Sequence, residues 1–124
     1  METVFRVCLL IAGVINALPS ILAILPQKIS DSYGIEILNV NHELLLRHRA
    51  VLFGIIGGIM IFSAISKRYY SLAVAIGMIS MLSFVLLFFL MKGEINPELK
   101  KVMYVDLVGI LILLVGFLLF KWKA

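Results

Sequence analysis

Four apolar segments, each about as long as a bilayer is thick, dominate the sequence. A helix needs about 20 consecutive apolar residues to cross the hydrocarbon core of a membrane, and such segments lie at about residues 7–25, 44–66, 69–91 and 103–120. Lipid offers no partner to an open backbone N–H or C=O group, and four strands are too few to close a barrel. The sequence therefore predicts one all-α domain over residues 1–124, a four-helix transmembrane bundle.

The composition supports this class. Of the 124 residues, 63% are apolar and 15% are charged, whereas soluble domains are about 45–50% apolar. The net charge of +4 comes from basic residues that stand singly or in pairs at the ends of the segments. Basic residues in such places anchor helices to lipid headgroups. Membrane lipids are thus the expected partners, and nucleic acid is not.

The flanking charges predict an orientation. One end of the bundle carries the basic residues Arg6, Lys67, Arg68, Lys121 and Lys123, opposed only by Glu2. The other end carries four basic residues, or six when Arg47 and Arg49 are counted, together with five acidic ones. Because basic residues stay on the cytoplasmic side, the near absence of acid at the first end predicts that both termini are cytoplasmic. Arg6 before an apolar run is also typical of a signal peptide, but no small-x-small cleavage site follows, so we expect the segment to be retained.

Small residues at helical spacing predict the faces through which the helices pack. Ala50, Gly54 and Gly58 form a small-xxx-small run in the second segment. The other segments carry comparable stripes, namely Gly13, Asn16, Ser20 and Ala23, then Ala73, Gly77, Ser80 and Ser83, and then Asp106, Gly109, Leu113 and Gly116. The large side chains of the third segment, among them Phe84, Phe88 and Met81, are expected to face lipid or to fill the core.

Ionisable residues within a membrane span are the first candidates for a site, because each costs roughly 2.5–3.5 kcal/mol at a helix centre. Arg47, His48 and Arg49 lie just inside the second segment, and Asp106 lies about one turn inside the fourth. Asn16 is the deepest polar residue of the first segment. By helix direction all five belong to the leaflet under the long connection 26–43.

Pro19 follows Asn16 by one turn and is expected to kink the first helix and free a carbonyl. In the long connection, Asp31, Ser32, Tyr33 and Gly34 form a turn signal. A long connection in a compact protein is a common place for function, so we expect a site to lie beneath it.

Two interpretations of the charged residues stay open. In the first they are structural ion pairs, with Glu43 bound to Arg47 at a spacing of four residues and Arg49 bound to Asp106. In the second they line a pocket for a small amphipathic ligand. Arg47 and Arg49 would then bind its polar head, Asp106 would orient the two arginines, Asn16 would add a deeper hydrogen bond, and His48 could carry protons.

Other chemistry has little support in the sequence. Cys8 is the sole cysteine, so no disulfide or thiol pair can form within the chain, and we expect it to be a small buried side chain. His42 and His48 lie six residues apart without further ligands at metal-binding spacing, so no metal is predicted and the cofactor is left unknown. No catalytic residue is predicted. Small multidrug exporters have this size, but they need an acidic residue in the first helix, where this chain has Asn16.

The second segment also resembles a known family. The stretch LLLRHRAVLFG at residues 44–54 is similar to the start of the second helix in DoxX-like four-helix membrane proteins, with Arg49, Ala50 and the glycines from Gly54 onward carrying the match. Arg47 and His48 stand where that family has Glu-x before the arginine. The resemblance implies a protein of the bacterial inner membrane, and some members are tied to quinone-linked sulfur redox work.

The sequence thus favours a non-enzymatic accessory protein that binds a quinone or a lipid on the long-connection side. Two alternatives stay open. One is a small-molecule transporter or exporter subunit that acts as a homodimer, and the other is the membrane subunit of a redox enzyme with a soluble redox partner.

Overall fold

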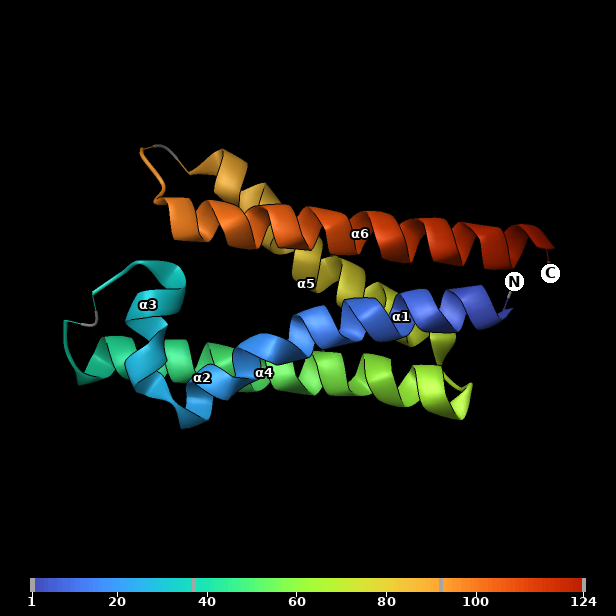
Figure 1. Cartoon of the computed structure of the whole chain (residues 1–124), viewed down its shortest axis with the longest axis horizontal. Helices are drawn as coiled ribbons and strands as arrows, with labels where there is room; N and C mark the ends of the chain where they lie inside the picture. Colours follow the sequence, from blue (N-terminus) through green and yellow to red (C-terminus); the bar gives the residue numbers. More distant parts are fainter. Residues whose placement is uncertain (1, 37, 92, 124) are drawn as a thin grey trace.

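The computed structural model describes residues 2–36, 38–91 and 93–123, and in that part of the chain it contains helices and no strand (Figure 1). The elements are α1 (Glu2–Ala17), η1 (Leu18–Ser20), α2 (Ile21–Ile24), η2 (Pro26–Lys28), α3 (Ile29–Tyr33), α4 (Val40–Ser66), α5 (Tyr70–Leu90) and α6 (Pro97–Lys123). Among these residues, four spans are long and apolar enough to cross a membrane, namely Glu2–Ile24, Val40–Ser66, Tyr70–Leu90 and Pro97–Trp122. The predicted all-α four-helix bundle is confirmed, and the chain is a multi-pass membrane protein.

The first span is interrupted at Pro19, as predicted. A proline has no N–H group to donate to the preceding turn, and here the α-helical pattern changes to the 3₁₀ helix η1 before α2 resumes it. The Ser20 hydroxyl donates to the Ala17 carbonyl at 2.6 Å. α2 then ends at Ile24, which leaves the carbonyls of its last turn without helical partners.

The long connection contains more structure than the sequence predicted. It holds η2 and α3, and α4 starts at Val40, four residues before the predicted start. Asn39 caps α4, because its side chain accepts a hydrogen bond from the His42 N–H at 3.0 Å. α3 ends at Gly34, which adopts the left-handed conformation (φ 63°) and donates its N–H to the Ser30 carbonyl at 2.8 Å. The predicted turn at Gly34 is therefore a helix end.

The four spans do not run parallel throughout. α1 lies between α4 and α6, while α5 starts beside the end of α4 and crosses the bundle diagonally to reach the start of α6 (Figure 1). α4 and α5 are joined by a short turn at residues 67–69 and separate toward the other end of the molecule. The two chain termini lie at the same end of the molecule as this turn (Figure 1), and we call that end the terminal end. The opposite end, which contains α3, is the connection end.

Aromatic packing and a capped helix hold the terminal end together. The Phe5 ring lies 4.9 Å from the Tyr70 ring and 5.1 Å from the Phe120 ring, which joins α1 to α5 and α6. Arg6 donates from Nε to the Ala64 carbonyl at 2.7 Å. This bond satisfies one of the carbonyls that the last turn of α4 leaves open.

The small residues of α4 pack against the first span, with one correction. Ala50 is buried, and a Cβ atom added at Gly54 would lie 2.8 Å from the Ser20 Cβ. Gly58 was predicted on this face, but it is exposed and a Cβ atom there would meet no described atom within 4 Å. Gly57 takes its place, because each step of four residues rotates about 40° around a helix and a second such step leaves the interface.

Candidate functional site

Asn16 lies fully inside the bundle and joins two helices. Its side chain is 3% exposed. Its Nδ2 donates to the Ala12 carbonyl at 2.9 Å, and its Oδ1 accepts from the Ser80 hydroxyl on α5 at 3.0 Å. The predicted deep polar residue is therefore bound to protein groups, and it contacts the cavity described below only through Ser80.

Arg49 is half-buried, and its guanidinium lies among aromatic rings. Its central carbon is 4.6 Å from the centre of the Phe53 ring, 5.2 Å from that of Tyr33 and 5.7 Å from that of Phe84. Its Nη1 donates to the Tyr33 hydroxyl at 2.9 Å. The rings come from α3, α4 and α5, so Arg49 marks the place where these helices meet. Cation–π contacts of this kind stabilise a guanidinium that has little water around it.

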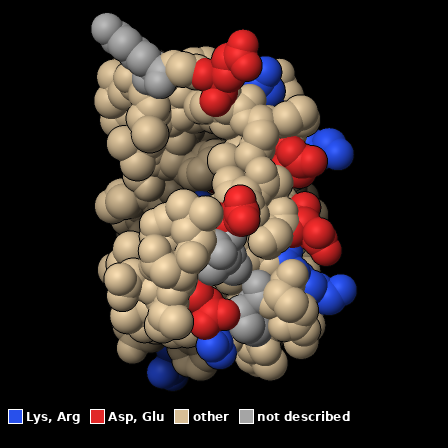
Figure 2. Space-filling model, turned by 90° about the vertical axis from the view of Figure 1, so that its left-hand side faces the viewer, with Lys and Arg blue, Asp and Glu red and all other residues tan. Residues whose placement is uncertain are grey.

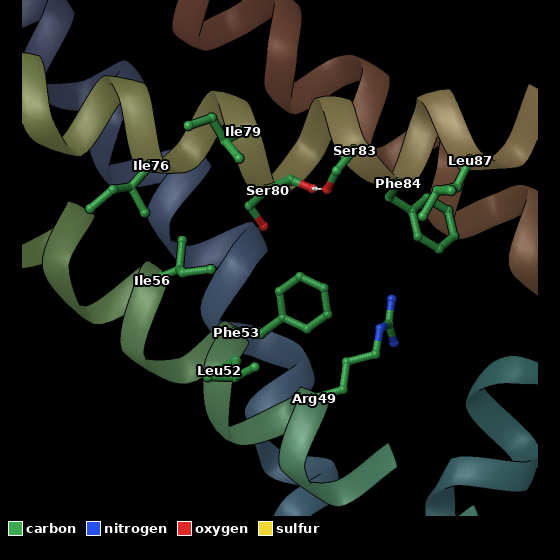
Figure 3. A pocket seen from close by; sticks show the side chains of 10 residues that line it. All are labelled: Arg49, Leu52, Phe53, Ile56, Ile76, Ile79, Ser80, Ser83, Phe84 and Leu87. Atoms are coloured by element: carbon green, nitrogen blue, oxygen red, sulfur yellow. Dashed lines mark hydrogen bonds between the residues drawn. The ribbon is translucent and has the colours of Figure 1, made fainter. Parts of the chain in front are cut away.

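Two apolar cavities meet at this arginine. The deeper one has a volume of about 420 Å³ and lies between α4 and α5. It is lined by Arg49, Leu52, Phe53, Ile56, Ile76, Ile79, Ser80, Ser83, Phe84 and Leu87. Figure 3 shows Arg49 and Phe53 extending from α4 toward α5, with Ser80, Phe84 and Leu87 facing them from that helix.

The second cavity lies nearer to the connection end and has a volume of about 370 Å³. It is lined by Tyr33, Ile35, Leu46, Arg49, Phe84, Leu87, Phe88, Met91, Ile95 and Leu99. A hollow opens on this face of the molecule between the α5–α6 connection and α3 (Figure 2). Arg49, Phe84 and Leu87 line both cavities, so the two adjoin at these residues, and we call them together the α4–α5 groove.

Arg47 points to another side of α4. Its Nε donates to the Ala23 carbonyl at 2.9 Å, which is one of the carbonyls in the last turn of α2. The acceptor is thus a carbonyl at the end of α2, before Pro26. The sequence had suggested a carbonyl freed by Pro19 as a partner. Arg47 lines neither cavity of the α4–α5 groove, so the structure does not bring the two arginines together.

His48 and Asp106 also lie apart from Arg49. His48 is exposed on α4. Asp106 is half-buried and lines a different groove, between the first span, α3 and α6, together with Pro19, Asp31 and Glu98. Of the five predicted ligand-binding residues, only Arg49 contacts the α4–α5 groove directly.

The two predicted ion pairs are not formed among the described residues. Arg47 donates instead to the Ala23 carbonyl on α2, and Arg49 donates to the Tyr33 hydroxyl. Asp106 lines a separate groove from Arg49. A single sequence predicts the helical turn that carries each charged residue. It does not predict the neighbour toward which the long side chain extends.

Across residues 2–36, 38–91 and 93–123 no three side chains of His, Cys, Asp or Glu come together as a metal site. Cys8 is half-buried on α1, and a Cβ atom added at Gly116 on α6 would lie 2.7 Å from its Cβ. Cys8 is therefore part of the α1–α6 contact.

Comparison of the chain with protein-family models, with curated proteins and with solved structures gives no match. The resemblance to DoxX-like proteins therefore stays a prediction.

Three aromatic residues of the site were not singled out from the sequence as site residues. Phe53 follows Arg49 by four residues, so the two share a helix face, and this signal was available. Tyr33 and Phe84 lie on other helices. Their approach to Arg49 depends on how α3 and α5 are placed, which no local pattern encodes.

Proposed function

We propose that this protein binds a small amphipathic membrane ligand in the α4–α5 groove. The observation that carries the proposal is the position of Arg49, whose guanidinium stands at the junction of two apolar cavities with the neutral Tyr33 hydroxyl as its hydrogen-bond acceptor. A pocket with apolar walls and a few polar groups is typical of ligand sites, and about 420 Å³ is within their usual range. Arg49 binds the polar head, and the apolar part lies along α4 and α5.

The depth of Arg49 in the membrane agrees with such a ligand. Arg49 is 17 residues from Ser66, the last residue of α4, which is about 26 Å of helix at 1.5 Å per residue. The hydrocarbon core is about 30 Å thick. Arg49 thus stands near the boundary between core and headgroups in the leaflet at the connection end, where the polar heads of amphiphiles lie.

Arg49 and Arg47 form a matched pair for the test, because they have the same charge and are two residues apart, but only Arg49 lines the groove. We expect native mass spectrometry of gently extracted protein to show a bound lipid or quinone on the wild type and on Arg47→Ala, and to show its loss on Arg49→Ala. A wild type without bound ligand would contradict the proposal. So would retention of the ligand by the Arg49→Ala variant.

We also propose that both termini face the cytoplasm of a bacterial inner membrane. The terminal end has five basic residues and one acidic residue, and basic residues next to the spans favour the cytoplasmic side. The α4–α5 groove would then open toward the outer leaflet.

A further inference from the structure

The charge of the α4–α5 groove points to one class of ligand. A guanidinium stays protonated in proteins, so Arg49 brings a full positive charge to the groove. The groups around its guanidinium are the uncharged rings of Tyr33, Phe53 and Phe84, and the Tyr33 hydroxyl is also its hydrogen-bond acceptor. In the described part of the chain no carboxylate forms an ion pair with it, and Asp106 lies on a separate groove.

The Arg49 guanidinium also has N–H donors in addition to the one that binds Tyr33. A guanidinium has five N–H donors, and the Tyr33 hydroxyl accepts from one of its nitrogens. Charged oxygen pairs, as in a carboxylate or a phosphate, match that fork with two parallel hydrogen bonds, and such charge-assisted bonds are about twice as strong as neutral ones. An uncharged carbonyl or hydroxyl also accepts hydrogen bonds from a guanidinium, but it leaves the positive charge uncompensated.

The rest of the groove defines the ligand's other half. From Arg49 the deeper cavity extends along α4 to Ile56 and along α5 from Leu87 to Ile76, which is about 10 to 16 Å of helix at 1.5 Å per residue. Apart from Arg49 and the serines of α5, its walls are hydrocarbon and aromatic side chains. An apolar chain fits beside them, with its charged end at the lipid headgroup level.

We infer that the ligand of the groove is an anionic amphiphile, with a carboxylate or phosphate head bound by Arg49 and an apolar chain in the deeper cavity. The inference rests on the proposed function and narrows it, because it excludes an uncharged quinone as the preferred ligand. The negative charge of the head balances the positive charge of Arg49, with which no described carboxylate forms an ion pair.

The test compares three sixteen-carbon probes that differ in the head, together with one uncharged quinone. Purified protein in a neutral detergent is titrated with hexadecanoate, hexadecyl phosphate, hexadecanol and a decyl quinone, and bound probe is counted by native mass spectrometry. We expect the two anions to bind at least about tenfold more tightly than hexadecanol and the quinone, as two charge-assisted hydrogen bonds would give. A preference between the two anions tells which head the site takes, and either preference supports the inference.

Variants locate the preference. Arg49→Gln should lose the preference for the two anions over hexadecanol, while Arg47→Gln should keep that preference. Arg49→Lys keeps the charge but not the planar pair of donors, so it should show a reduced preference for the anions. This variant replaces Arg49→Gln in the test if Arg49→Gln does not fold.

The outcomes separate the two proposals. If hexadecanol and the quinone bind as tightly as the anions and still depend on Arg49, the inferred charge is wrong and the proposed function stands. If the anions keep their advantage in Arg49→Gln, the inference is also overturned, because the preference arises elsewhere. If no probe binds to the wild type, the proposed function itself fails.

Discussion

Asn16 shows what one polar residue does deep in a membrane bundle. It is 3% exposed, yet both ends of its amide are bonded, to the Ala12 carbonyl and to the Ser80 hydroxyl. The bond to Ser80 fixes the rotation of α1 relative to α5. It also orients a hydroxyl at the wall of the deeper cavity, so the residue supports the site without lining it.

Replacing Ser80 by Ala should lower the free energy of unfolding by about 0.6–1.7 kcal/mol, the usual range for hydrogen bonds between membrane helices. The variant leaves the Asn16 Oδ1 without its donor in a place that water does not reach. Titration of the protein in mixed micelles with sodium dodecyl sulfate, followed by circular dichroism, measures the change.

Ser83 is the matched control for this prediction. It lies one turn further along α5, but its hydroxyl donates to the Ser80 carbonyl of its own helix and its side chain is exposed. Ser83→Ala should change the stability by less than about 0.5 kcal/mol. An equal loss in both variants would mean that the bond to Asn16 contributes nothing specific.

Of the charged residues selected from the sequence as candidates for a site, the structure places only Arg49 on the α4–α5 groove. Arg49 could be selected because a charge inside a span is costly and therefore uncommon. The same argument selected Arg47 and Asp106, which the structure places in other surroundings. The difference lies in the directions of long side chains and in the approach of Tyr33 from α3, both of which depend on tertiary packing.

At the scale of the elements, the contact between α1 and α4 depends on the absence of a single side chain. A Cβ atom at Gly57 would lie 2.5 Å from the Gly13 carbonyl oxygen and 2.6 Å from the Ala17 Cβ. Both neighbours belong to the opposite helix, and backbone atoms cannot move without shifting it. Such close approach between backbones is typical of membrane helices that pack through small residues.

Gly57→Ala should therefore destabilise the bundle by about 1–3 kcal/mol, the usual cost of overpacking. Gly58→Ala, one residue further, should leave the stability unchanged or raise it by up to about 1 kcal/mol, since alanine is the better helix former and its methyl group meets open space. The same denaturant titration compares the two. Equal losses in both variants would contradict the placement of α1 on α4.

The helices and their number could be predicted because the bilayer leaves a long apolar chain few choices. The start of α4 could have been predicted more closely, since Asn39 is a typical N-cap residue. α3 could not have been predicted from the sequence, because its five residues are too few to form a helix alone. Its residues Ile29 and Tyr33 are buried and held by the surrounding bundle.

At the scale of the whole molecule, the two ends of the bundle are built differently. The terminal end is held by stacked aromatic rings and by Arg6 on the end of α4. At the connection end α5 leaves α4, and α3 and the α5–α6 connection close the space only in part (Figures 1 and 2). Asn96 ties these two segments together, since its Nδ2 donates to the Tyr33 carbonyl at 2.8 Å. The groove exists because of this divergence, which no periodicity in the sequence encodes.

The same difference between the ends makes the proposed orientation testable. In a Cys8→Ala background, which removes the native thiol, single cysteines are placed at Ser32 on α3 and at Arg68 in the α4–α5 turn, both of them exposed. We expect a membrane-impermeant maleimide to label Ser32→Cys in intact cells and Arg68→Cys only after the membrane is permeabilised, because the basic terminal end favours the cytoplasm. The reverse pattern would place the groove in the cytoplasmic leaflet. Equal labelling of both variants in intact cells would show that the chain inserts in both orientations, in which case the charge difference between the ends does not decide its topology.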